Sequence, residues 1–293
     1  MKLKKPLNFA ITALGFLVAA LFAVAFLVPT VLTVADSFMT QTELTAKYGM
    51  VFPSGSGYMS QSVGLVFIPD KVSFSQYETV LLKSPDYLLK FWNSAILTLP
   101  IVAFQLVIAA LASYAFTKFR GRVKEIIFFS YIILMLMPYQ VTLVPNYLVA
   151  KWTGLIDTRW AIILPGVAAP FSVFLLTKFM RRISTSLFEA AKLDGAGEMT
   201  ILVKICLPMC KSALYSIAIL VFIDYWNMVE QPLILLSDET LHPLSIFLSR
   251  INQAEVGLAF AVATIYMIPC LFLFLHGETY LVEGITYSGA IKG

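Results

Sequence analysis

Residues Ser94–Thr117 read SAILTLPIVAFQLVIAALASYAFT, a run of 24 residues with no charged side chain. An α-helix rises 1.5 Å per residue, so this run extends about 36 Å as a helix. The hydrocarbon core of a bilayer is about 30 Å thick, and a charge-free apolar run of this length is typical of a spanning helix. The stretch therefore predicts a helix that crosses a membrane.

Five further apolar runs have comparable length, and they occupy Phe9–Ala35, Ile126–Ala150, Trp160–Thr177, Leu207–Met228 and Val256–His276. Only α-helices and closed β-barrels cross a bilayer, because lipid cannot satisfy free backbone groups. Barrel strands alternate apolar and polar residues with a period of two, and these runs do not. We therefore expect an all-α membrane protein with six transmembrane helices, in which the prolines of the third, fourth and sixth helices predict kinks.

The composition excludes a water-soluble domain. Of the 293 residues, 59% are hydrophobic and only 13% are charged, whereas soluble domains carry about 25% charged residues. The mean hydropathy is +0.83. The net charge of +4 is small and does not indicate nucleic acid, and three cysteines do not suggest a disulfide framework.

The distribution of basic residues predicts the orientation. With the N-terminus in the cytoplasm, two thirds of the 21 Lys and Arg residues fall on the inner side, as the positive-inside rule requires. We expect residues 1–35 to form the first helix with a cytoplasmic N-terminus, 36–90 a long extracytoplasmic loop, 91–281 a five-helix core and 282–293 a cytoplasmic tail. The first apolar run is longer than the 7–15 residues of a signal-peptide core, so it is interpreted as a retained helix.

The loop at 184–208, between the fourth and fifth helices, is the most informative cytoplasmic segment. Ser186 and Glu189 have the spacing of a capping box, which predicts a helix start. Gly195 is suited to the left-handed conformation that ends a helix. A second short helix is expected to reach about Leu207, with Pro208 opening the next membrane helix. A rigid helix–turn–helix of this kind is suited to docking into a groove on a soluble partner.

The spacing of this loop resembles the EAA loop of ABC importer permeases. The matching residues are Glu189, Ala190, Ala191, Asp194, Gly195, Ile205, Leu207 and Pro208. Trp92-Asn93-Ser94, Trp226-Asn227 and the closing Ile291-Lys292-Gly293 are similar to the maltose-type carbohydrate branch, whose pattern covers most of the chain from Phe91 onward. Ser184 and Ser212 depart from that pattern, in which proline is common at the corresponding places.

The resemblance implies one permease subunit of an ATP-driven sugar importer in a bacterial cytoplasmic membrane. It implies a homologous second permease in a heterodimer, two ATP-binding cassette subunits and an extracytoplasmic solute-binding protein. The loop at 184–208 would couple to the ATPase subunits. The sequence contains no G-x-x-x-x-G-K-[ST] loop. We therefore expect no cofactor on this chain and ATP with Mg²⁺ in the partner subunits.

Four polar residues near the predicted helices are candidates for the substrate pathway: Asp224, Asn227, Asn93 and Gln140. Acids inside membrane helices usually face a cavity or a partner, although such polar groups also hold helices together. Packing is the favoured role of Asn93 and Gln140, and also of Gln105 and Asn146. Cys206 and Cys210 alone make a poor metal site. No residue set suggests catalysis, a metal site or nucleic-acid binding.

Three alternatives remain open. An ABC permease for a non-sugar solute would share the coupling loop. An intramembrane enzyme would need acid–base residues gathered at one membrane face, and the sequence shows no such group. An ion-coupled transporter would be expected to have inverted repeats and charged residues near the middle of the membrane. Asp224 is the one residue that favours this alternative.

Overall fold

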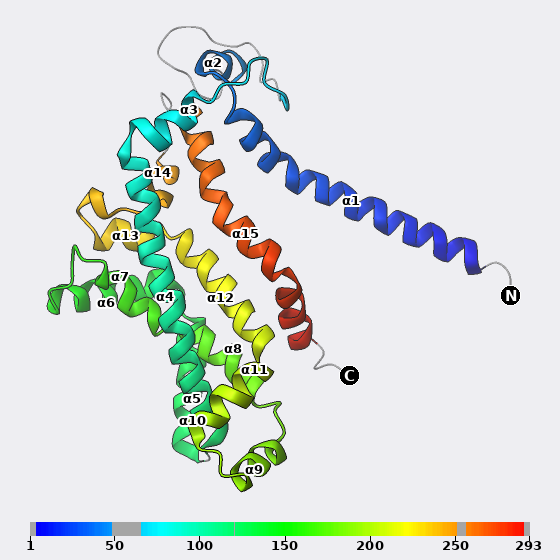
Figure 1. Cartoon of the computed structure of the whole chain (residues 1–293), viewed down its shortest axis with the longest axis vertical. Helices are drawn as coiled ribbons and strands as arrows, with labels where there is room; N and C mark the ends of the chain where they lie inside the picture. Colours follow the sequence, from blue (N-terminus) through cyan, green and yellow to red (C-terminus); the bar gives the residue numbers. More distant parts are fainter. Residues whose placement is uncertain (1–3, 49–65, 120, 251–255, 290–293) are drawn as a thin grey trace. The chain divides into compact units, whose positions relative to one another are not determined.

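The computed structural model describes residues 4–48, 66–119, 121–250 and 256–289, and over these residues every regular element is a helix (Figure 1). The main elements are α1 (Lys4–Asp36), α2 (Gln41–Tyr48), α3 (Ser75–Glu78), α4 (Pro85–Lys118), α5 (Arg122–Leu136), α6 (Tyr139–Trp152), α7 (Trp160–Val167), α8 (Pro170–Met180), α9 (Thr185–Leu193), α10 (Glu198–Ile201), α11 (Leu207–Met209), α12 (Lys211–Trp226), α13 (Glu230–Leu235), α14 (Leu244–Ser249) and α15 (Val256–Gly289). The all-α membrane class expected from the sequence is confirmed.

The chain divides into two compact units, one made of residues 1–88 with 250–267 and the other of 89–249 with 268–293. In the first unit a small core forms from Met39, Leu44 and Tyr48, with Phe260 of α15 packed against it. Gly257 allows this packing, since a Cβ there would lie 2.6 Å from Oε1 of Gln41. The first unit therefore holds α2 directly against the start of α15.

The described parts of the expected loop at 36–90 contain helical elements. These are α2, α3 and a π-helical turn at Thr79–Lys83. Helix α4 begins at Pro85, within the expected loop and before the boundary placed at residue 91. Proline is favoured in the first turn of a helix because its missing N–H has no intrahelical partner there. The part of the expected loop at 49–65 lies outside the described residues.

Four helical stretches are long and apolar enough to cross a membrane: Thr12–Asp36, Pro85–Lys118, Trp160–Met180 and Val256–Val282. Two bent helix pairs also qualify if each pair forms one span, which gives up to six spans among the described residues. These two pairs correspond to the expected third and fifth helices. Helix α15 continues through Gly289, so the expected tail begins as helix.

The kink expected within the third helix, at 126–150, is a full break between two helices. Helices α5 and α6 meet at an angle of 106°. Pro138 lies between them, and the preceding Met137 takes the extended conformation, with ψ of 128°. Proline disfavours the helical conformation in the residue before it, which explains why the break falls here. Pro145, by contrast, lies inside α6 without ending it.

The fifth helix also differs from the expectation. The segment that ends with α11 turns by 77° at Cys210 before α12 begins. Leu207 and Pro208 therefore belong to the segment before the bend, and Pro208 does not open the helix that follows. That helix is α12, which starts at Lys211.

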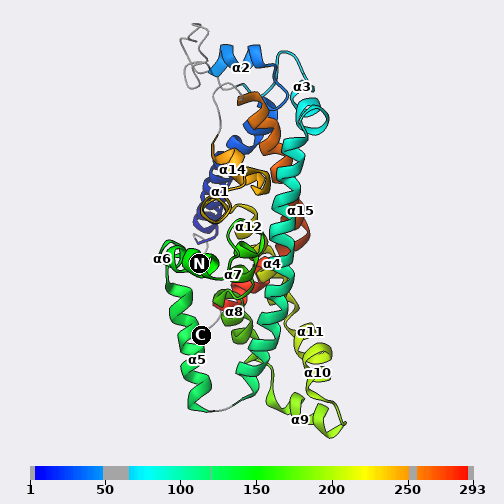
Figure 2. The same cartoon turned by 90° about the vertical axis from the view of Figure 1, so that its left-hand side faces the viewer.

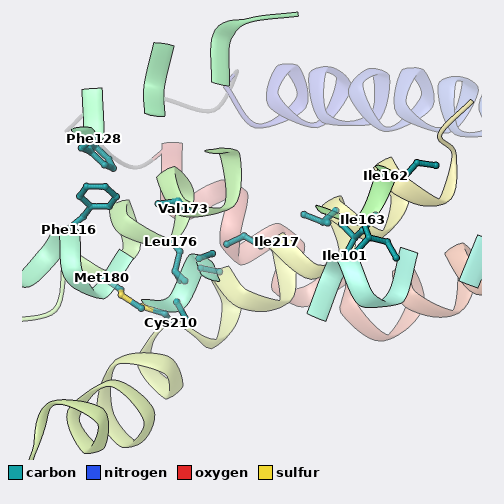
Figure 3. Packing of buried hydrophobic residues seen from close by; sticks show 14 of the residues in the cluster. Ile101, Phe116, Phe128, Ile162, Ile163, Val173, Leu176, Met180, Cys210 and Ile217 are labelled. Carbon is teal, nitrogen blue, oxygen red and sulfur yellow. The ribbon is translucent and has the colours of Figure 1, made fainter. Parts of the chain in front are cut away.

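The core of the second unit joins α4, α5, α7, α8 and α12. Figure 3 shows Phe116 of α4 beside Phe128 of α5, and their ring centroids are 5.2 Å apart. Two buried hydrogen bonds tie α4 to α8, because Nε2 of Gln105 donates to Oγ of Ser172 at 2.7 Å and Ser113 donates to a backbone carbonyl of α8 at 2.9 Å. Such polar contacts help helices associate in lipid.

Helices α12 and α15 approach closely at Gly277. A Cβ at Gly277 would clash with Cδ1 of Ile219. One turn along, Oγ of Ser216 donates a hydrogen bond to the carbonyl of Tyr280 at 2.9 Å. Small residues at a helix crossing let two backbones pack at short range, which is a common way of joining helices in membranes.

We predict that Gly277→Val destabilises the protein by about 1–3 kcal/mol, because the added side chain overpacks the α12–α15 contact. The measurement is the thermal unfolding midpoint of the detergent-solubilised protein. Gly15→Val is the matched control, because a Cβ there meets no atom within 4 Å. Adding Ile219→Ala to Gly277→Val should recover part of the loss. Equal midpoints for the two valine variants would contradict the close packing.

Candidate coupling loop and membrane pocket

The predicted helix–turn–helix at 184–208 is present. Helix α9 is followed by a turn, and then by α10, a π-helical turn at Leu202–Cys206 and α11. Gly195 has φ of +79°, a conformation that other residues adopt only with strain. The turn is closed by backbone hydrogen bonds from Gly195 N–H to the Lys192 carbonyl at 3.0 Å and from Ala196 N–H to the Ala191 carbonyl at 2.9 Å. The glycine thus fixes the angle between two helical segments.

The capping box predicted from Ser186 and Glu189 is wrong. Helix α9 begins at Thr185 with Ser184 at the capping position, and no side chain caps the first turn. The hydroxyls of Ser184 and Ser186 are 2.7 Å apart and bond to each other. The Glu189 side chain is therefore left out of the cap.

The loop has an exposed half and an anchored half. Helix α9 contains no buried residue, and Glu189, Ala190, Asp194 and Gly195 are exposed. Leu193 is 89% exposed. In the anchored half, Ile201, Leu202 and Cys206 are buried in the main core, and the half-buried Ile205 and Leu207 pack against it. Figures 1 and 2 both show α9 at one end of the second unit.

Glu198 connects the two halves of the loop to α4, through contacts that we call the Glu198 clasp. Its carboxylate pairs with Lys118, lies 3.4 Å from Nζ of Lys192 and accepts a hydrogen bond from the Tyr114 hydroxyl at 2.5 Å. Tyr114 and Lys118 belong to the last turns of α4, whereas Lys192 lies in the last turn of α9. The carboxylate of Glu198 therefore links α10 to the neighbouring α9 and to α4, which is 84 residues away in sequence at Tyr114.

The negative charge of Glu198 that holds the clasp together is favoured at neutral pH. The hydrogen bonds from Lys118 and Tyr114 lower the pKa of Glu198 to about 2, from an ordinary value of 4.5. Because the pKa is lower in the folded state, the ionised carboxylate stabilises the fold, and this stabilisation is complete when the pH is above the ordinary pKa of 4.5. It is lost as the pH falls from 4.5 towards 2. Because Glu198 is solvent-exposed, salt screens the contacts.

A cavity of about 310 Å³ lies between α9 and the ends of α4 and α8. Charged side chains of α4, of α9 and of the residue that follows α8 line it, namely Lys118, Glu189, Lys192 and Arg181. Arg181 also lies over the Phe128 ring, 4.6 Å from its centroid. The cavity lies beside α9, which is held by the clasp, by the turn, and by Phe188 and Ala191 that pack against the main core.

A second feature of this unit is a pair of adjoining hollows, of about 530 and 520 Å³, at the other end of α12. They share Tyr139, Asp224, Tyr225 and Gln231, and we call the two together the acidic pocket. The bend between α5 and α6 and the break between α7 and α8 supply one wall, which includes Met137 and residues 168–170. The prolines that interrupt these helices therefore help to form the pocket.

The structure separates the four pathway candidates. Asp224 and Asn227 line the acidic pocket, whereas Gln140 lies beside it and donates from Nε2 to both carboxylate oxygens of Glu230, at 3.3 and 3.4 Å. Tyr139, Asn146, Glu230 and Gln231 also line the pocket, and sequence analysis did not select three of them. The Pro138 break was the available signal for Tyr139.

Asn93 lies elsewhere and is only 2% exposed. Its Nδ2 donates to the carbonyls of Thr240 and His242, at 2.7 and 3.2 Å, and its Oδ1 accepts from Arg159 at 2.8 Å. With its amide engaged on both sides, Asn93 holds the start of α4 against the segment before α14. It acts in packing and does not line the pocket.

Comparisons with known proteins agree on one family. The family model described as "binding-protein-dependent transport system inner membrane component" matches residues 105–285. The arabinooligosaccharides transport system permease protein AraQ of Halalkalibacterium halodurans is 27% identical, over 98% of both chains. The probable ABC transporter permease protein YurM of Bacillus subtilis is 36% identical, over 69% of both chains.

A solved structure shares the fold. A chain in the crystal structure of a bacterial ABC transporter involved in the import of the acidic polysaccharide alginate matches with a TM-score of 0.78. It is 23% identical, and the match covers 93% of this chain and 97% of that chain. At this level of identity the comparison supports the fold alone.

We predict that Glu198→Gln loosens the attachment of α9, because the neutral amide loses the ion pairs with Lys118 and Lys192. Hydrogen–deuterium exchange of the protein in lipid nanodiscs should become at least about threefold faster over residues 185–193, as expected where local opening becomes easier. Glu125→Gln, an exposed glutamate on α5, is the matched control. Unchanged exchange in α9 would show that the clasp does not restrain it.

Proposed function

The chain belongs to the family of binding-protein-dependent transport system inner membrane components, and on that premise we propose that it forms half of the translocation pathway of an ATP-driven importer for a sugar or oligosaccharide. It is a multi-pass protein of a bacterial cytoplasmic membrane, and its role is that of an ABC importer permease subunit. The observation that carries the proposal is the coupling loop, which combines an exposed helix, a fixed turn and an anchored second segment.

The coupling loop suits the transmission of a displacement. An ATPase subunit that moves α9 would move a rigid element, because the turn at Gly195 holds α9 at a fixed angle to α10. The displacement would then reach α12 through the anchored segment, which joins that helix at the Cys210 bend, and it would reach α4 through the Glu198 clasp. A flexible loop in this place would absorb the same displacement.

We infer the partners from the same family membership. They are a homologous second permease in a heterodimer, two ATP-binding cassette subunits that bind ATP with Mg²⁺, and an extracytoplasmic binding protein that delivers the solute. ATP hydrolysis belongs to the separate subunits, since this sequence has no phosphate-binding loop of the Walker type. With one permease per half-channel, the acidic pocket would complete its walls from the second permease.

We further propose that each bent helix pair contributes one span, the second of them through α12, which gives six spans with both termini in the cytoplasm. The excess of Lys and Arg on that side supports this orientation. It places the coupling loop on the side where the ATPases work. It places the hollows around Asp224 at the far end of α12, towards the side from which a solute would enter.

A glycan substrate fits both the relatives and the pocket. AraQ, one of the similar proteins, is named for transport of arabinooligosaccharides. The acidic pocket offers aromatic rings, amides and carboxylates, with Tyr139, Asn146 and Gln231 among them. Sugars present hydroxyl groups that donate to and accept from such side chains, and a pocket of a few hundred cubic ångströms is of the size that small ligands occupy.

We predict that Gly195→Pro abolishes the stimulation of ATPase activity in the complete importer by solute-loaded binding protein. Proline requires φ near −65°, so it cannot adopt the observed +79°. The milder Gly195→Ala should lower stimulation several-fold, because left-handed backbone strains an alanine by about 1–2 kcal/mol. The measurement is phosphate release by the purified complex in proteoliposomes, with and without binding protein.

Gly197→Ala is the matched control. Gly197 has φ of −72°, which alanine adopts readily, and a Cβ there meets no atom within 4 Å. This variant should retain most of the stimulation. Full stimulation in a correctly assembled Gly195→Pro complex would contradict the coupling role. Solute uptake by the chain alone in liposomes without nucleotide would contradict the ABC importer itself.

A further inference from the structure

The acidic pocket carries two carboxylates and no basic side chain. Asp224 of α12 and Glu230 of α13 line it, and its other lining residues are all uncharged. Neither carboxylate has a Lys, Arg or His within salt-bridge distance in the part of the chain that the structure describes. Glu230 is approached by the neutral amide of Gln140, at 3.3 and 3.4 Å, and no hydrogen bond to Asp224 is found among the described residues. The negative charge of the pocket is therefore not neutralised by this chain.

The remaining lining has the groups that bind neutral sugars. Tyr139 and Tyr225 supply aromatic rings, and Asn146, Asn227 and Gln231 supply amides that both donate and accept hydrogen bonds. A carboxylate can only accept, and hydroxyl groups of a sugar are suitable donors to it. The two acids thus add strong acceptors to a pocket that already has rings and amides.

The same two acids oppose an acidic sugar. A uronate carries its own carboxylate, and like charges at close range repel strongly where water is scarce. A site built for a uronate would be expected to present Arg or Lys, since a guanidinium or an ammonium pairs with a carboxylate. The residues of this chain that line the pocket include neither.

We propose that the acidic pocket selects neutral oligosaccharides and rejects those that contain uronic acids. The proposal rests on the proposed function, since it requires that solute passes this pocket. It separates the chain from the alginate transporter that shares its fold, because alginate is an acidic polysaccharide and the likeness of 23% identity extends to the fold alone. It agrees with the arabinooligosaccharides named for AraQ.

The test uses two probes with the same sugar backbone, trigalacturonate and its fully methylated ester, in which each charged carboxylate is replaced by a neutral methyl ester. Their binding to the complete importer without nucleotide is measured at pH 7.5 by saturation-transfer difference NMR. The solute-binding protein is left out, so that its own preference does not enter. We expect the ester to bind at least about tenfold more tightly than the acid, as repulsion between close carboxylates in a partly buried site implies.

The double variant Asp224→Asn/Glu230→Gln keeps the shape and removes both charges. We expect it to bind the acid and the ester within about threefold of each other, chiefly through a gain in binding of the acid. Glu239→Gln, an exposed acid on the 3₁₀ turn at Glu239–Leu241, is the matched control and should leave the ratio as in the wild type.

Three outcomes overturn the proposal: an acid that binds the wild type as well as the ester does, a ratio that the double variant leaves unchanged, or no binding of either probe. Each of these leaves the coupling role intact if binding protein still stimulates the ATPase activity of the same preparation. Loss of that stimulation in the wild-type complex would instead count against the proposed function.

Discussion

The left-handed turn at Gly195 is the constraint on which the coupling role depends. It joins an exposed helix to a segment whose Ile201, Leu202 and Cys206 are buried in the membrane unit. Because the backbone of the turn closes through its own hydrogen bonds, α9 keeps a fixed angle to the anchored segment. Without that fixed angle, a movement of α9 would have no defined effect on α12 or α4.

Interruptions of helices shape the rest of the second unit. The Pro138 break turns α6 away from α5 by 106°, and the Cys210 bend turns α12 away from the coupling segment by 77°. The first interruption helps to open the acidic pocket, and the second brings the coupling loop to the start of a membrane helix. Broken helices are tolerated in membranes where the irregular backbone is buried in protein or lines a cavity. Interrupted helices therefore shape both the acidic pocket and the attachment of the coupling loop to α12.

Much of this could be predicted from the sequence. Charge-free runs such as Ser94–Thr117 predict membrane helices by length alone, and Gly195 predicts a left-handed helix end because other residues resist that conformation. Two details differ from the prediction. Ser184 takes the capping position two residues before Ser186, because both serines can end the chain segment before a helix. A proline either ends a helix, as Pro138 does, or remains inside it, as Pro145 does, and tertiary packing that the sequence does not display decides between the two.

Contacts between distant residues could not be predicted. Glu198 and Tyr114 are 84 residues apart in sequence, and no local pattern marks their hydrogen bond. Asn93 and Asp224 are both candidates for the pathway, with packing the favoured role of Asn93. In the structure the amide of Asn93 is hydrogen-bonded on both sides, whereas Asp224 lines a pocket. Polar residues in apolar runs signal either a pathway or helix packing, and only the three-dimensional arrangement separates the two.

The central claim is that α9 lies against an ATPase subunit, and cysteine cross-linking tests it most directly. Leu193 is 89% exposed at the end of α9, and Trp152 is 87% exposed at the end of α6. In the complete, active importer, we expect Leu193→Cys to cross-link to a cysteine series on the ATPase subunits, with a yield that changes between the nucleotide-free and ATP-bound states. Trp152→Cys should give no such product. An active complex in which Leu193→Cys reaches no ATPase subunit in any nucleotide state would contradict the account.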